Sequence, residues 1–200
     1  DDTAAVVRSF DDPRIHWYDL PKAPNFGYAN RNVAVREARG ELMAFMAHDD
    51  VFTPDHLELL GACFADQRVE WAYSRPLWVA DDGTIIPFAV DLRDPGQLAM
   101  FLERQNTIPA SCVVYRRRCH DRVGLWPEDV ERGGDWLLWK SIVGPSRGAN
   151  LAYMPEPTVL HFRAVWKSGP QWGPPPLLAW LEESRDGWWP AALRQTPRLS

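Results

Sequence analysis

A short run of apolar residues, Leu42 to Ala47, ends directly in the polar stretch His48 to Asp50. Such an unbroken run is typical of a strand that is covered on both faces in a parallel sheet. Thr53 is a good N-cap and Pro54 suits a first helical position, so a helix is expected to follow. Open parallel sheets bind ligands at the carboxyl ends of their strands, where helix N-termini converge. The pattern therefore predicts two carboxylates at the ligand-binding edge of an α/β fold.

The rest of the chain divides between helical and strand-like patterns. The expected helices span residues 4–10, 29–38, 95–103, 116–123, 135–143 and 177–183, and the expected strands span residues 14–18, 42–47, 69–74 and 111–115. Asp82-Gly83, between two apolar pairs of residues, indicates a hairpin. Beyond Pro155 we expect little regular structure apart from the last helix. The alternation of strands and helices in the first part, followed by a hairpin, predicts an α/β fold with a mixed sheet flanked by helices.

The composition limits the classes of partner. The formal net charge is -5 and no dense block of lysine and arginine is present, which argues against a protein that binds duplex nucleic acid. No apolar run approaches the roughly 20 residues that a helix needs to cross a bilayer, and the chain does not open on a basic and apolar leader. We therefore expect a cytoplasmic protein without a transmembrane segment, free or peripheral at the inner face of the membrane. Its three cysteines show no metal-like spacing and are expected to be reduced thiols.

Asp49 and Asp50 pose an electrostatic problem. Two like charges about 4 Å apart repel by roughly 4 kcal/mol at an effective dielectric constant near 20, which is costly in a covered site. A divalent cation reverses the sign of that interaction, and carboxylate oxygens suit Mg2+ or Mn2+, which keep open positions for the oxygens of a diphosphate. The alternative is that Asp50 caps the helix or accepts from loop amides while Asp49 is solvated. Spacing alone leaves both interpretations open.

Three segments of the chain resemble a known family. The segment NFGYANRNVAVREARGELMAFMAHDDVFTPDHLELL resembles the family 2 glycosyltransferases of the GT-A fold, in which a helix carrying Arg-Asn and ending in Ala-Arg-Gly-Glu precedes a strand and an Asp-x-Asp-type motif. The segment NTIPASCVVYRRRCHDRVGLWPEDVERGGDWLLWKSIV is similar to the acceptor-side part of that family, and DDTAAVVRSF is similar to the end of its first acidic loop and the helix that follows. The resemblance implies a GT-A domain over residues 1–165, followed by a Trp- and Pro-rich C-terminal extension over residues 166–200.

The resemblance also implies roles for particular residues. The donor-binding residues would be Arg31, Asn32, His48, Asp49 and Asp50. Asp50 would also brace the acidic motif. Asp135 matches the catalytic base, which takes a proton from the acceptor hydroxyl. A divalent metal, Mn2+ or Mg2+, would be held by Asp49 and by His161, which falls where some relatives place a late metal-contacting residue. The alternative for His161 is an ordinary histidine of the core or surface.

Four tryptophans and a run of three arginines each allow two interpretations, a structural role or a ligand-binding role. Stacking on a sugar face is one role for Trp136, Trp139, Trp166 and Trp172, although packing is the more common role of such residues. The run Arg116 to Arg118 is expected to be a solvated helix start rather than a phosphate site.

Three departures from the family pattern stand out. The first strands of the GT-A fold would lie upstream of Asp1, so we expect an N-terminally truncated GT-A domain. Ala47 stands at the first acidic position of the Asp-x-Asp motif. Gly134 stands where the family often has a glutamate directly before the base.

The sequence thus predicts an inverting, metal-dependent glycosyltransferase that moves a sugar from a nucleotide-diphosphate donor to a hydroxyl group. The acceptor would be a glycan or a lipid-linked molecule in polysaccharide or glycoconjugate synthesis. One alternative is a catalytically inactive GT-A-like module that binds carbohydrate or nucleotide within a larger protein. Another is a nucleotidyltransferase, which also sets acidic residues at strand ends but needs a Gly-rich basic loop that this sequence does not show.

Overall fold

The computed structural model describes residues 2–80 and 84–162. These residues form two compact units, one within residues 2–39 and 125–134 and the other within residues 40–80, 84–124 and 135–162. The expected helix over 177–183 and the expected boundary near residue 165 lie outside the described residues, as do Trp166 and Trp172. No helix in the described part of the chain is long and apolar enough to span a membrane.

The first unit is built on helix α2, Tyr28–Glu37, which confirms the helix expected over 29–38. A shorter helix, α1 at Thr3–Arg8, precedes it and buries none of its residues. Directly before α2, the 3-10 turn η1, Asn25–Gly27, has three successive residues with positive φ. The strand expected over residues 14–18 is wrong, because Arg14 belongs to a turn and residues 15–18 have no regular secondary structure and pair with no strand in the described chain.

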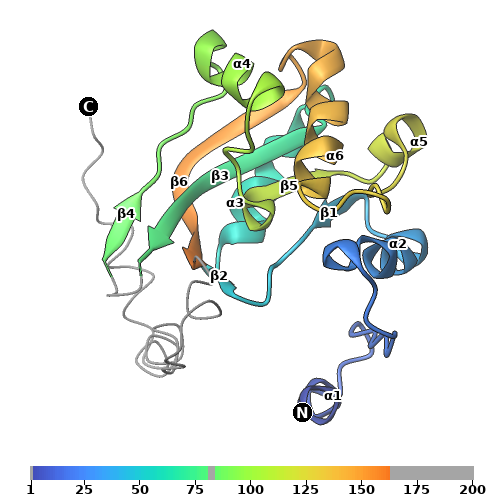
Figure 1. The fold of residues 1–200 in the computed structure, drawn as a ribbon. Helices are drawn as coiled ribbons and strands as arrows, with labels where there is room; N and C mark the ends of the chain where they lie inside the picture. The colour runs from blue at the N-terminus through green and yellow to red at the C-terminus, as the bar shows by residue number, and fades with distance from the viewer. Residues whose placement is uncertain (1, 81–83, 163–200) are drawn as a thin grey trace. The chain divides into compact units, whose positions relative to one another are not determined.

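The second unit is built on a six-stranded sheet with the order β1-β5-β3-β6-β2, in which β4 also pairs with β3. The strands are β1 Leu42–Ala44, β2 Asp50–Phe52, β3 Trp71–Val79, β4 Ile85–Pro87, β5 Val113–Arg116 and β6 Leu151–Phe162. The long strands β3 and β6 run side by side and in parallel through the centre of this unit (Figure 1). All other pairs are antiparallel. The sheet is therefore mixed, and β1 lies against antiparallel β5 rather than in a parallel sheet as its apolar run suggested.

Helices cover both faces of this sheet. They are α3 His56–Ala62, α4 Pro95–Glu103, α5 Cys119–Val123 and α6 Gly134–Val143, with the 3-10 turns η2 Cys63–Ala65, η3 Ala110–Cys112 and η4 Gly144–Ser146. On one face Leu60 and Phe64, from α3 and η2, pack against Ala72 of β3. Trp71 points to the opposite face, as alternation along a strand requires, and contacts Trp139 of α6 and Phe101 of α4.

The prediction of α4 is correct at both ends, because Asp94 caps the helix by accepting from the Gln97 N–H at 2.9 Å and Pro95 follows it. The hairpin is also confirmed, since Val79 of β3 pairs with Ile85 of β4, while its turn lies outside the described residues. The helix expected after Pro54 begins two residues later, at His56. Strand β6 contradicts the expectation of little regular structure beyond Pro155.

Candidate functional site

Asp49 lies in a short turn between β1 and β2, and Asp50 is the first residue of β2. The Ala47 N–H donates to the Ser111 hydroxyl at 3.0 Å, and the Asp50 N–H donates to the Ala47 carbonyl at 3.2 Å. Within this turn His48 is exposed and Asp49 is half-buried. The structure therefore presents Asp49 at the surface of the second unit, as a ligand-binding role requires.

Asp50 has a different environment from Asp49. It is only 3 % exposed, and strand register places it opposite His161 of β6. Its Oδ1 accepts from His161 Nδ1 at 2.9 Å and from the Phe162 N–H at 3.2 Å. Because a carboxylate only accepts, Nδ1 carries the hydrogen, and it is the neutral form of the ring that has a lone pair on Nε2. The structure thus brings Asp50 and His161 together, and Asp50 orients the imidazole from a buried position.

The arrangement around His161 fits a metal ligand. Histidines that bind metals almost always donate their other ring N–H to a carboxylate or carbonyl, as His161 does to Asp50. The side chain is 24 % exposed, and Trp78 packs edge-on against its ring at 5.1 Å. No three His, Cys, Asp or Glu side chains converge on one point in the described part of the chain. The described residues therefore contain no ready set of three such ligands, and Asp49 and His161 stay predicted ligands of an ion that would take further ligands from a diphosphate.

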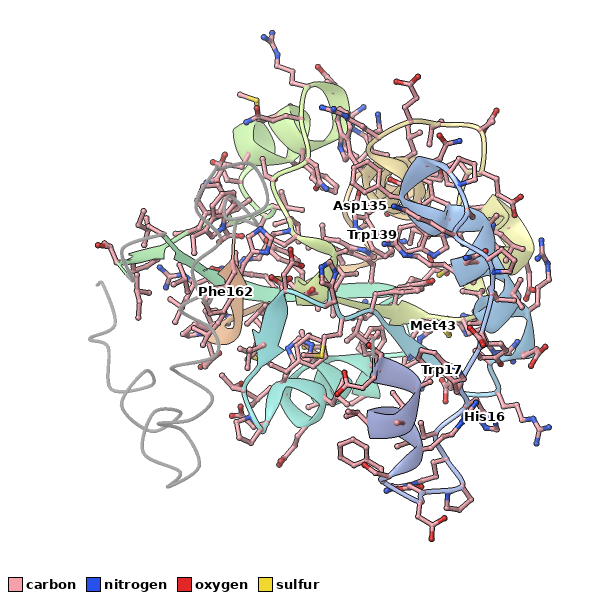
Figure 2. The ribbon with its side chains drawn as sticks, turned by 60° about the horizontal axis from the view of Figure 1, so that its bottom comes forward. His16, Trp17, Met43, Asp135, Trp139 and Phe162 are labelled. Atoms are coloured by element: carbon pink, nitrogen blue, oxygen red, sulfur yellow. The ribbon has the colours of Figure 1, made fainter. Side chains whose placement is uncertain are left out.

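Asp135 lies in the first turn of α6, one turn before Trp139, and both residues are labelled in Figure 2. The side-chain amide of Asn106 donates to Asp135 Oδ2 at 2.8 Å. The next residue, Trp136, donates its indole N–H to the Phe101 carbonyl at 2.6 Å, while the Lys140 ammonium lies 3.8 Å from its ring centroid. Trp139 is fully buried and therefore packs in the core, whereas Trp136 is half-buried and is held by its hydrogen bond to Phe101. The carboxylate itself is half-buried and has an oriented neighbour.

Arg31 and Asn32 lie on α2 in the first unit. Asn32 is 1 % exposed, accepts from the Trp126 N–H at 3.0 Å and donates to the Trp126 carbonyl at 2.8 Å. This side chain fixes the segment that contains Trp126. The Arg31 guanidinium lies 5.3 Å from the Tyr28 ring and 4.9 Å from the Trp126 ring, and it finds no hydrogen-bond acceptor among the described residues. Of the two, Arg31 is the residue whose donors remain available to a ligand.

Gly134, which stands before Asp135, has a structural explanation in the first unit. Its N–H donates to the Tyr28 hydroxyl at 3.0 Å. A side-chain carbon at Gly134 would lie 2.6 Å from Cζ of the Tyr28 ring, far closer than atoms approach. The Tyr28 ring thus occupies the space that a glutamate would need here.

A buried polar chain, which the sequence did not indicate, lies under the sheet near β2. His56 Nδ1 is 2.7 Å from the Thr158 hydroxyl, which donates to the Ser74 hydroxyl at 2.6 Å. Burial lowers the pKa of His56 to about 4, so this imidazole is neutral at pH 7. The three cysteines are free, as expected, and burial raises the pKa of the Cys112 thiol well above its usual value.

The expected solvated helix start at Arg116 is wrong. Arg116 is the last residue of β5 and is 1 % exposed. Its guanidinium donates to the carbonyls of Val69 and Phe64, each at 2.8 Å, and pairs with Glu41. Arg116 is therefore a structural residue of the second unit.

Comparisons with known proteins agree with this geometry. The family model described as "Glycosyl transferase family 2" matches residues 1–124. An uncharacterized glycosyltransferase of Bacillus subtilis (strain 168), YwdF, is 30% identical over 118 residues, which are 54% of this chain and 41% of YwdF. A crystal structure of residues 1–349 of S. aureus TarS in complex with UDP-GlcNAc is similar with a TM-score of 0.62 and 16% identity, covering 82% of this chain and 46% of that chain. A second TarS crystal structure gives a TM-score of 0.61 over 82% of this chain and 29% of that chain. The likeness confirms the expected GT-A fold, and the chain spans less than half the length of each of these relatives.

Proposed function

The chain belongs to the family 2 glycosyltransferases, and on that premise we propose that it moves a sugar from a nucleotide-diphosphate donor to a hydroxyl acceptor. The pairing of Asp50 with His161, next to Asp49, carries the proposal, because it provides an oriented imidazole beside a carboxylate. TarS, which shares the fold, was crystallised with UDP-GlcNAc, which supports a sugar nucleotide as the donor class.

Asp49 and the Nε2 atom of His161 would hold a divalent metal, Mn2+ or Mg2+, under the donor diphosphate. When bound, the metal offsets the negative charge of the departing diphosphate. Asp50 keeps the His161 tautomer that leaves Nε2 available, and its burial prevents it from competing as a ligand. The Arg31 guanidinium would contact the donor through its available N–H groups. Asn32 would act on the donor only indirectly, through the segment around Trp126.

Asp135 would act as the catalytic base in a single inverting displacement. Its carboxylate takes the proton of the acceptor hydroxyl, the acceptor oxygen bonds to the anomeric carbon, and the bond from that carbon to the diphosphate breaks on the opposite face. Asn106 holds Oδ2 of this carboxylate. The acceptor would be a glycan or lipid-linked hydroxyl in polysaccharide or glycoconjugate synthesis, and the reaction would take place in the cytoplasm.

The test is UDP release from UDP-GlcNAc in the presence of Mn2+, with and without an oligosaccharide acceptor. We expect Asp135→Asn to lower kcat by roughly 100-fold or more, because the amide cannot accept the proton. Asp121→Asn removes an exposed carboxylate on α5 and should leave the rate unchanged. Equal rates for wild type and Asp135→Asn would contradict the proposal. Tight UDP binding without turnover would favour the inactive binding module, and pyrophosphate release from a nucleoside triphosphate and a sugar phosphate would favour a nucleotidyltransferase.

A further inference from the structure

The six residues Asn106 to Ser111 form a link that contacts both parts of the candidate site in the second unit. We call residues 106–111 the positioning segment. At one end Asn106 Nδ2 donates to Asp135 Oδ2 at 2.8 Å. At the other end Ser111 Oγ accepts from the Ala47 N–H at 3.0 Å. One short stretch of chain therefore holds the candidate base and the turn that carries Asp49.

At the first end, a local hydrogen bond to the backbone orients the Asn106 side chain. Asn106 Oδ1 accepts from the Ile108 N–H at 3.1 Å, which turns the amide nitrogen toward Asp135. This local ring between a side chain and the backbone two residues on is a common way for asparagine to fix a turn. Because the Asn106 amide donates to one carboxylate oxygen, it restricts rotation of the Asp135 side chain.

The Ser111 end is buried and has no freedom to adapt. Ser111 is 1 % exposed and lies in η3, directly before β5. Its hydroxyl accepts from the backbone at Ala47, the first residue of the turn, and the Ala47 carbonyl in turn accepts from the Asp50 N–H. The position of the turn thus depends on a hydroxyl that comes from a distant part of the sequence, the 3-10 turn before β5.

The middle of the segment is stiff. Ile108 is 1 % exposed and anchors the segment in the core. Pro109 has a φ fixed by its ring, and its carbonyl accepts from the Cys112 N–H at 2.9 Å. The core anchor at Ile108 and the turn at Pro109 therefore hold each end of the segment in a fixed position.

We propose that the positioning segment sets the distance between the base and the acidic turn, with Asn106 and Ser111 as positioning residues. The inference rests on the proposed function, in which Asp135 faces the acceptor hydroxyl and Asp49 lies under the leaving diphosphate. An in-line displacement needs the base and the diphosphate site at the correct distance on opposite sides of the anomeric carbon. A misplacement of about 1 Å can lower the rate about 100-fold. Separate effects follow at the two ends, because each residue touches a different part of the site.

The Asn106 end is tested by Asn106→Ala in the UDP-release assay. We expect kcat to fall about tenfold with the donor KM within about twofold, since a hydrogen bond to a charged group is lost while donor binding is untouched. Gln105→Ala, an exposed amide one residue earlier, is the matched control and should change neither constant. An unchanged kcat, or a rise in donor KM with kcat constant, overturns this end of the proposal.

The Ser111 end is tested by Ser111→Ala and by Ser111→Cys, which keeps the shape of the side chain but is slightly larger and has a weaker acceptor. We expect the Kd for UDP with Mn2+, measured by calorimetry, to rise about fivefold to tenfold in both variants, because the turn that carries Asp49 loses its anchor. Ser141→Ala removes an exposed hydroxyl on α6 and should leave the Kd unchanged. Wild-type affinity in both Ser111 variants overturns this end.

A measurement that needs no turnover separates this inference from the proposed function. In NMR spectra of the chain, the side-chain amide signals of Asn106 should shift in Asp135→Ala and the amide signal of Ala47 should shift in Ser111→Ala. Shifts at both places, with equal turnover in wild type and Asp135→Asn, would contradict the proposed function and leave the positioning segment intact. Activity that depends on Asp135 but not on Asn106 or Ser111, or spectra without these shifts, would refute the segment alone.

Discussion

Replacing Gly134 by alanine should destabilise the protein, because the added methyl group meets the Tyr28 ring. Its carbon would lie 2.6 Å from Cζ and 2.8 and 2.9 Å from the two neighbouring ring carbons, about 1 Å inside a normal contact. The ring has little room to withdraw, since it is buried, stacks on Trp126 at 5.7 Å and accepts from the Gly134 N–H. Overpacking of this kind costs about 1–3 kcal/mol. In a protein of this size the melting temperature should fall by about 2 to 12 °C.

The backbone is not the cause of this penalty, because Gly134 is not among the glycines with positive φ. Thermal unfolding followed by circular dichroism measures the effect. Gly61→Ala is the matched control: Gly61 lies in α3 with no atom near its missing side chain, so alanine there should raise stability by about 0.5–1 kcal/mol.

A double-mutant cycle with Tyr28→Ala identifies the ring as the source. Tyr28→Ala is itself destabilising, but in that background Gly134→Ala should carry no further penalty, which gives a coupling energy of about 1–3 kcal/mol. A Gly134→Ala variant that melts at the wild-type temperature would refute the reasoning. A penalty that persists after removal of the ring would do so as well.

Three further substitutions probe the second unit. Arg116→Leu should lower the free energy of unfolding in urea by about 3 kcal/mol, because buried carbonyls lose their donors, whereas the exposed Arg117→Leu should change it by less than about 1 kcal/mol. The pKa of His56 is lowered from 6.5 to about 4, so the unfolded chain binds the proton first and stability falls as the pH drops from 6.5 to 4. The loss approaches about 3 kcal/mol at pH 4 and should be absent in His56→Gln, as urea midpoints at several pH values would show. Asp50→Asn should weaken Mn2+ binding about tenfold in calorimetry, because the amide no longer fixes the His161 tautomer; unchanged affinity would argue against His161 as a ligand.

The parts of the fold that local signals encode were predictable. Helix α4 has its cap, its proline and its apolar spacing in consecutive residues, and the β3–β4 hairpin has its turn between two apolar pairs. The segment 14–18 shows the opposite case, because alternation alone does not make a strand without a partner to pair with. Strand β6 was missed because Pro155 and Pro157 interrupt its pattern, and the register shifts of its partner β3 near Arg75 accommodate them.

The residue types of the candidate site were predictable from the sequence. Which of these residues are buried and which contact one another was only partly predictable. That Asp49 and Asp50 follow a strand was visible, but which of them is buried depends on the pairing of β2 with β6, 111 residues away. The roles of Asn106 and Ser111 left no signal beyond a polar residue at each end of the stretch Thr107 to Ala110. Arg116 was misjudged because its neighbours in the sequence are basic, whereas its partners lie in other segments.

The account depends most directly on Asp49 and His161 as the ligands of a metal that meets a diphosphate. Crystals grown with Mn2+ and UDP, measured at the manganese absorption edge, test this without reference to turnover. We predict an anomalous peak about 2.0–2.3 Å from an Asp49 carboxylate oxygen and from His161 Nε2, shared with oxygens of the diphosphate. A manganese peak that contacts neither side chain, or bound UDP with no peak beside it, would contradict the account.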